Sequence, residues 1–208
     1  MHRRRIGIVI FDEVEVLDFC GPFEVFCATR LDEEHRWQDA SPLEVLLIAE
    51  SSSSITTAGG MRVIPNCAFD ACPNLDVLVV PGGRGTRREM HNEEMLSFVR
   101  SRASQVEKLA AVCTGALILG KAHLLDGLCA TTHWRSLSMM QELFPGVSVD
   151  AKSHVVKAGK VVTSAGISAG IDMALLMVAD FFGEGIARAT ARHMEYPFPE
   201  SNDRRIAP

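Results

Sequence analysis

The hydrophobic positions of the chain fall into short apolar runs that alternate with longer amphipathic segments. Four of the runs are rich in Val, Ile and Leu and end at charged or turn-forming residues, which is typical of buried β-strands. They comprise residues 5–11, 43–49, 77–80 and 108–112. Two more segments, 55–64 and 154–163, each place two β-prone arms around a glycine-containing turn and are predicted to form hairpins.

The amphipathic segments predict helices, because their apolar residues recur at spacings of three and four. The predicted helices comprise residues 23–35, 92–102, 114–122, 135–144, 171–182 and 184–193. Pro22 would lie in the first turn of the first helix, where a residue without an N–H is tolerated. Strands that alternate with helices favour an α/β fold with a doubly wound, mostly parallel sheet. No linker or repeat divides the sequence, so we expect a single domain over residues 1–208.

The charge and the apolar segments limit the partners of the protein. A formal net charge of -5 and an isoelectric point near 5.8 disfavour nucleic acid as a partner. The apolar stretch 6–11 is too short for the core of a signal peptide. The longest later apolar stretch, 173–182, contains Asp180 and is shorter than the roughly 20 residues that span a bilayer. We therefore expect a cytoplasmic protein without a membrane partner.

The cysteines are predicted to be reduced thiols, because no secretion signal accompanies them. None belongs to a CxxC pair or has the spacing of a zinc site. A cysteine is most often a small buried hydrophobic residue, and only Cys113 has a local context that argues otherwise. The six are Cys20, Cys27, Cys67, Cys72, Cys113 and Cys129.

Cys113 lies directly between a predicted strand and a predicted helix. A nucleophile at such an elbow needs small neighbours, and Ala111 and Gly115 meet that need. The N-terminus of the helix that begins at Thr114 would point its positive dipole at the sulfur. We therefore predict a catalytic cysteine whose thiol pKa is lowered, so that it is partly thiolate.

Distinctive residues also follow two other strands, at the edge of the sheet where ligands bind in open α/β folds. Gly82 and Gly83 follow the strand 77–80, and Asp18 follows the first strand. The glycines lack the ending of a phosphate-binding loop; they form either a flexible turn or an oxyanion hole in which the Gly83 and Thr114 amides point at charge beside the sulfur. Asp18 is either a helix cap or an acid that burial keeps protonated near Cys113.

His133 lies in a small, polar and aromatic setting, followed by Trp134. It either lines the pocket or is an ordinary core histidine. The remaining histidines show no pairing and receive no role.

The motifs together resemble the ThiJ/PfpI superfamily, whose fold is like that of class I glutamine amidotransferases and is of the flavodoxin type. The similar segments span nearly the whole chain, and the most characteristic are 17–26, 80–83, 111–116, 130–134 and 163–172. This resemblance implies a cysteine nucleophile at Cys113, an acidic partner at Asp18 and a homodimer. Protease-like and deglycase-like members usually carry His after the cysteine and Glu as the acid, whereas this sequence has Thr114 and Asp18.

The set of Asp, Cys-Thr-Gly and Thr-Thr-His-Trp looks most like isonitrile hydratases, a class of hydro-lyases. The resemblance implies that Cys113 attacks an isonitrile, that Asp18 moves protons, and that Thr114 orients water or substrate. Trp134 and Ile167 would hold a small, neutral, apolar substrate, and neither a metal nor an organic cofactor is needed. The product would be an N-substituted formamide.

Two alternatives remain open. One is a glyoxalase or deglycase that acts on reactive carbonyls, although such chemistry favours a histidine beside the cysteine. The other is a non-enzymatic ligand or redox sensor, because the sequence also looks like the amidase-like domain of AraC-type regulators. Fifteen residues follow His193, so we expect no helix-turn-helix module in this sequence.

Overall fold

The computed structural model describes residues 3–206 and contains a seven-stranded sheet with the order β10-β11-β7-β6-β1-β2-β5. All neighbouring strands in it are parallel except β10 and β11, which form an antiparallel hairpin. Its strands are β1 (Arg4–Val9), β2 (Leu43–Ala49), β5 (Cys67–Ala68), β6 (Val77–Val80), β7 (Lys108–Val112), β10 (Val155–Ala158) and β11 (Val161–Ser164). Two small two-stranded sheets are formed by β3 (Ile55–Thr56) with β4 (Arg62–Val63) and by β8 (Cys129–Ala130) with β9 (Ser148–Val149).

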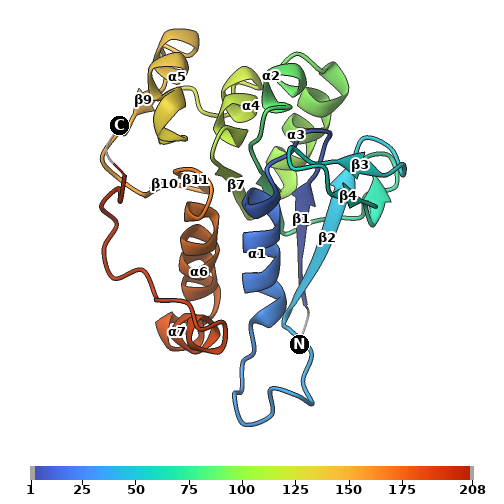
Figure 1. Ribbon diagram of the computed structural model, residues 1–208, viewed down its shortest axis with the longest axis vertical. Coiled ribbons are helices and arrows are strands. Elements are labelled where there is room, and N and C mark those ends of the chain that lie inside the picture. The colour runs from blue at the N-terminus through green and yellow to red at the C-terminus, as the bar shows by residue number, and fades with distance from the viewer. Residues whose placement is uncertain (1–2, 207–208) are drawn as a thin grey trace.

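Helices cover both faces of the large sheet (Figure 1). The helices are α1 (Val16–Ala28), α2 (Thr86–Glu89), α3 (Glu93–Gln105), α4 (Gly115–Lys121), α5 (Leu137–Leu143), α6 (Ala169–Phe182) and α7 (Glu184–His193), with a 3₁₀ turn η1 (Trp134–Ser136) before α5. Helices α1 and α6 pack side by side on one face, with α7 against α6. Helix α4 contacts β6, β7 and α3. The predicted α/β fold with a doubly wound, mostly parallel sheet is confirmed.

The chain changes direction across the sheet between β1 and β6. From β1 the path runs through α1 to β2 on one side, and from β6 it runs through α3 to β7 on the other. Since crossovers are right-handed, the two helices lie on opposite faces and leave a crevice at the carboxyl ends of β1 and β6. The loops after these strands and after β7 therefore meet at one edge of the sheet.

The first helix begins earlier than the sequence pattern predicts. It starts at Val16, so that Pro22 lies inside it and not in its first turn. The reason is tertiary packing: a Cβ on Gly21 would come within 2.8 Å of the Ile171 side chain, and Pro22 is itself in contact with the Gly170 segment of α6. Close approach to α6 outweighs the local cost of a proline in the helix. The helix that contains Asp18 is thus the neighbour of α6 in Figure 1.

The helix 92–102 and both hairpins are also confirmed. Asn92 caps α3 by accepting a hydrogen bond from the Glu94 amide, and Gly60 and Gly159 have positive φ at the hairpin turns. Among the described residues, no helix has both the length and the apolar character needed to cross a bilayer.

Candidate active site

Cys113 occupies the elbow between β7 and α4 and has a positive φ of 58°. Such a conformation is unfavourable for a residue with a Cβ and persists only when its surroundings hold it. The Cys113 amide donates to the carbonyls of Ser164 and Ala165, both at 3.2 Å, and the Thr132 hydroxyl donates to the Cys113 carbonyl at 2.7 Å. A Cβ at Gly115 would lie 2.0 Å from the Val80 carbonyl oxygen, so the elbow requires glycine there. The strand-to-helix elbow predicted from the sequence is present.

Asp18 lies in the first turn of α1 and is fully buried. The residue at the N-cap position is Glu15, so the cap interpretation of Asp18 is wrong. Its Oδ2 accepts a hydrogen bond of 2.9 Å from the Gly82 amide, whereas its Oδ1 is buried and has no hydrogen-bond partner of regular geometry in the described part of the chain. Burial raises the pKa of this carboxyl from 3.8 to about 7, against the opposing effects of the Gly82 amide and the Cys113 thiol.

The sulfur of Cys113 belongs to a residue that is only 5% exposed, and it interacts with the Asp18 carboxyl. Burial, followed by the negative charge of Asp18, raises the thiol pKa well above its ordinary value. The amides of Thr114 and Ile167 lower the pKa, but they do not outweigh these two effects. The expectation of a thiol pKa lowered by the α4 dipole is therefore wrong. Near neutral pH the thiol therefore keeps its proton, while the Asp18 carboxyl gains or loses its own in that range.

Gly83 does not take the place predicted for it in an oxyanion hole. Its amide donates to the Thr114 hydroxyl at 3.0 Å, and that hydroxyl also lies 2.8 Å from the hydroxyl of Thr86. The Thr114 side chain therefore fixes the glycine turn, while its backbone amide and that of Ile167 lie at the sulfur. Gly82 contributes through its bond to Asp18.

A cavity of about 350 Å³ opens over the sulfur. Cys113, Thr114, Gly83, His133 and Ile167 line it together, so five of the eight residues selected from the sequence share one cavity wall. Trp134 lines an adjoining cavity of about 230 Å³, which His133 and Ile167 also line. Asp18 and Gly82 line neither cavity; they are hydrogen-bonded to each other, and the Asp18 carboxyl interacts with the Cys113 thiol.

His133 is half-buried and neutral near pH 7, because burial and then the charges of Arg135, Arg204 and Arg87 lower its pKa. Its Nδ1 accepts a hydrogen bond from the Arg135 amide at 3.3 Å, which leaves the proton on Nε2. The interpretation of His133 as an ordinary core histidine is therefore wrong, since the residue lines both cavities.

Several residues of the site were missed from the sequence. A Cβ on Gly166 would lie 2.1 Å from the His133 ring and 3.2 Å from the Cys113 sulfur, so the absence of a side chain there leaves room for both groups. Thr132 holds the Cys113 carbonyl; it belongs to the Thr-Thr-His-Trp motif, but the motif alone does not indicate this role. Glu15 and the arginines of the cavity wall (Arg84, Arg87 and Arg135) were also missed, because exposed charges are common on any surface.

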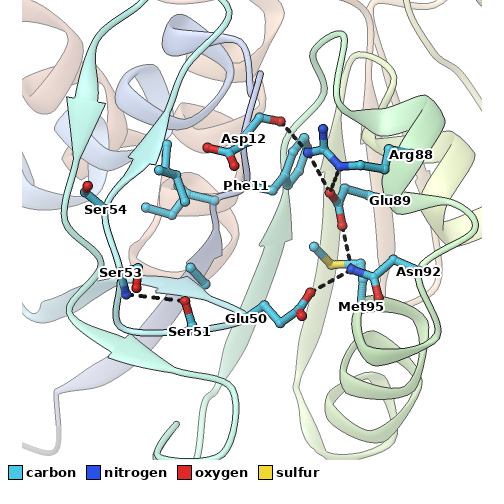
Figure 2. Close-up of a pocket in the computed structure, with 13 residues that line it drawn as sticks. Phe11, Asp12, Glu50, Ser51, Ser53, Ser54, Arg88, Glu89, Asn92 and Met95 are labelled. Carbon is cyan, nitrogen blue, oxygen red and sulfur yellow. Dashed lines mark hydrogen bonds and ion pairs between the residues drawn. The ribbon is translucent and has the colours of Figure 1, made fainter.

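Another cavity, polar and of about 280 Å³, lies at the carboxyl ends of β1 and β2 (Figure 2). The buried Glu89 at its wall pairs with Arg88 at 2.8 Å and accepts from the Asn92 amide group at 2.9 Å, and Asn92 also donates to Glu50. No Cys or His lines this cavity, and its buried carboxylate has partners. Among residues 3–206, no cluster of three or more His, Cys, Asp or Glu side chains is arranged to hold a metal ion. The Cys113 cavity is therefore the candidate active site.

Comparisons with known proteins give consistent results. A model of the DJ-1/PfpI family matches residues 4–180. An isonitrile hydratase of Pseudomonas putida is 36% identical over 193 residues, which are 92% of this chain and 78% of that protein. The HTH-type transcriptional regulator GbdR of Pseudomonas aeruginosa is 28% identical over 92% of this chain, which spans about half (50%) of the regulator. A deglycase of Pyrococcus horikoshii is 33% identical over 43% of this chain and 55% of its own length.

Solved structures agree with this relationship. A ThiJ/PfpI family protein from Pseudomonas syringae superposes with a TM-score of 0.83 at 29% identity, covering 97% of this chain and 79% of that one. Drosophila melanogaster DJ-1beta has the same fold, with a TM-score of 0.79 at 19% identity over 94% of this chain and 99% of its own. The predicted resemblance is confirmed, and the chain belongs to the DJ-1/PfpI family.

Proposed function

We propose that the protein adds water to an isonitrile and releases an N-substituted formamide, which makes it a hydro-lyase with a cysteine nucleophile. The proposal is supported by the buried Asp18 carboxyl beside the Cys113 thiol: the Gly82 amide holds one of its oxygens, and the other has no hydrogen-bond partner among residues 3–206. An isonitrile needs a nucleophile and a proton at the same carbon atom. A buried thiol beside a carboxyl supplies the nucleophile and the proton together.

In the first half of the reaction the thiol proton moves from Sγ to Asp18 as the sulfur attacks the terminal carbon of R–N≡C. Asp18, now a carboxylic acid, passes that proton to the same carbon. The product is a thioimidate, Cys–S–CH=N–R, beside an Asp18 carboxylate. The pKa of about 7 suits Asp18 to this double role, since a group with a pKa near the working pH both accepts and donates protons readily.

In the second half, Asp18 removes a proton from a water molecule while the oxygen of that water attacks the thioimidate carbon. Asp18 then passes the proton to the nitrogen of the thioimidate. The tetrahedral intermediate then loses its hydroxyl proton to Asp18, the C–S bond breaks, and R–NH–CHO leaves. The thiolate recovers its proton from Asp18, which restores the resting pair. The Thr114 and Ile167 amides, which already act on the sulfur, stabilise the thiolate at both stages. The neutral His133 offers its Nε2–H to the nitrogen of the substrate.

The proposal is tested by incubating the purified protein with cyclohexyl isonitrile and measuring the N-cyclohexylformamide formed by chromatography. Turnover should disappear in Cys113→Ala and fall by at least about a hundredfold in Asp18→Asn, the usual scale for loss of a general acid and base. Cys129→Ala, which removes an exposed thiol, is the matched control and should keep full activity. Absence of turnover in the wild type, or equal turnover in Cys113→Ala, would refute the proposal.

A second candidate function is supported by His133. Hydration or deglycation of a reactive carbonyl favours a histidine near the nucleophile, and His133 lines the same cavity as Cys113 although it is distant in sequence. Turnover of methylglyoxal, without turnover of the isonitrile, would select this candidate. Oxidation of Cys113 without turnover of either compound would select a sensor.

We further propose that the protein works in a reducing compartment such as the cytoplasm, because all six cysteines are free thiols. Assembly into a homodimer also stays a prediction, which sedimentation equilibrium of the purified protein would test.

A further inference from the structure

We infer that the preferred substrate carries a carboxylate or a similar small anion on its R group, and that arginines at the mouth of the Cys113 cavity bind it. This inference rests on the proposed function and specifies its substrate class. It also revises the expectation of a neutral, apolar substrate. The arginines are Arg84, Arg87 and Arg135, and we call them the rim arginines.

The charge at the mouth is opposite to that of the protein. The chain has a formal net charge of -5, yet three arginines and only one acidic residue, Glu15, line the cavity that contains Cys113. All three rim arginines are exposed. A cavity wall with one sign of charge raises the local concentration of ligands with the opposite charge.

Among the residues that the structure places, no carboxylate neutralises the rim arginines. None of the ion pairs within residues 3–206 involves any of the three. Arg88, one residue beyond Arg87, differs in this respect, since it pairs with Glu89 at 2.8 Å and with Glu13 at 3.6 Å. Within the described part of the chain, the Arg87 guanidinium makes a single long hydrogen bond of 3.5 Å, to the Gly83 carbonyl. The rim guanidiniums are therefore available to an anion.

The aromatic side chain beside the cavity orients one of these cations. The guanidinium of Arg135 lies 4.7 Å from the centre of the Trp134 ring, a cation–π contact that restricts an otherwise flexible side chain. Trp134 and Ile167 thus provide apolar surface for the stem of the R group, with Arg135 at its end.

A fourth arginine approaches from the C-terminal segment. Figure 1 shows this segment returning from α7 past α6 toward the strands β10 and β11. It is held there by hydrogen bonds between Asn202 and Val155, at 2.8 Å in both directions. Arg204 then donates to the Thr132 carbonyl at 3.1 Å and lines the Trp134 cavity, while its buried Nε has no partner among the described residues. The cations thus converge on His133 from three segments of the chain, which is consistent with the neutral state of its ring.

The first test compares two substrates that differ in one charge, isocyanoacetate and its methyl ester. The wild type should use the anion with the higher kcat/KM, and the difference should lie in KM, because the rim arginines bind the R group and not the reacting carbon. Raising the salt concentration from about 0.05 to 0.5 M should raise KM for the anion only, since exposed charges are screened over that range.

The double variant Arg84→Gln/Arg87→Gln should reduce the preference for the anion by about tenfold, the scale of two exposed charge contacts. The matched control is Arg100→Gln, which removes an exposed arginine on α3 that pairs with Glu93 and should leave the preference unchanged. Thermal unfolding checks that each variant is folded. An ester used as well as the acid, with a ratio that the double variant does not change, would overturn the inference.

A second test does not require turnover. Iodoacetate and iodoacetamide both alkylate a thiolate, forming a C–S bond and expelling iodide, but only iodoacetate is an anion. At each cysteine, the rate with iodoacetate is divided by the rate with iodoacetamide. This ratio should be about tenfold higher at Cys113 than at the exposed Cys129 in the wild type, and nearly equal at the two cysteines in the double variant. Equal ratios at the two cysteines would overturn the inference. If neither isonitrile is turned over, the hydratase proposal fails, while the alkylation ratio still decides whether the cavity selects anions.

Discussion

Replacing Asp18 with Asn should make the protein more stable, and the gain should grow with pH. Asp18 is fully buried, and burial raises its pKa from 3.8 to about 7 in the folded protein. Asn has nearly the same shape, and its Oδ1 still accepts the hydrogen bond from the Gly82 amide. The substitution therefore removes the ionisable group and places an NH2 group at the position of Oδ1, a change whose cost does not vary with pH. It isolates the cost of holding a carboxylate in the active site.

The magnitude follows from the two pKa values. Between pH 3.8 and about 7 the folded state binds a proton that the unfolded state has lost, so the stability of the wild type falls as the pH rises. Each pH unit of difference corresponds to about 1.4 kcal/mol, which gives a full penalty of about 4 kcal/mol above pH 7. Below pH 3.8 both states are protonated and the penalty is absent. Between about pH 5 and pH 8.5 the advantage of Asp18→Asn should grow by about 3 kcal/mol.

The assay is urea denaturation of both proteins across this pH range. The difference between the two free energies of unfolding is the quantity to plot, because contributions from distant groups cancel in it. A flat plot would mean that Asp18 ionises as easily in the folded as in the unfolded state. That result would refute the burial argument and the proton-sharing pair with it.

Three other outcomes are expected. In the wild type, kcat/KM for the isonitrile should rise with pH through about 7, because Asp18 must be ionised to accept the thiol proton; a profile that falls through this range would contradict its role as base. Thr132→Val should lower the free energy of unfolding by about 1–3 kcal/mol in urea titrations, since it leaves the Cys113 carbonyl without its 2.7 Å hydrogen bond, and an unchanged value would show that the bond is dispensable. Gly115→Ala should destabilise by more than about 3 kcal/mol, or prevent folding, because its Cβ would overlap the Val80 carbonyl oxygen, whereas Ala122→Gly should cost only about 1 kcal/mol.

The sequence predicted the parts of the fold that depend on local patterns. Strands β2, β6 and β7 have the residue ranges predicted from their apolar runs, since a buried parallel strand needs a continuous apolar stretch. Strands β5, β8 and β9 were missed because each contains only two residues, too few for any periodicity. The start of α1 was missed for a different reason. The start of this helix is determined by packing against α6, and the residues around Pro22 give no information about that contact.

The site shows the same division. The elbow at Cys113 could be predicted, because a sharp turn from strand to helix requires small residues beside its central position, and that requirement is met within a few residues of sequence. The direction of the thiol pKa could not, since it depends on burial and on Asp18, which is 95 residues earlier in the chain. The donor role of the Gly83 amide was likewise decided by the Thr114 hydroxyl. Which group a buried donor or acceptor meets is a tertiary property.

The raised pKa of Cys113 is compatible with catalysis when the pair is considered as one acid. A thiolate and a carboxylate side by side would place two negative charges in a site where burial already raises the pKa of both groups. Moving the single proton from sulfur to oxygen creates the nucleophile and removes the neighbouring charge in the same step. A thiolate beside a protonated Asp18 carries the same single proton as a thiol beside a carboxylate, so the two are forms of one pair. A substrate that must gain both a nucleophile and a proton at one carbon is therefore served by a pair that carries one proton, and not by two ionised groups.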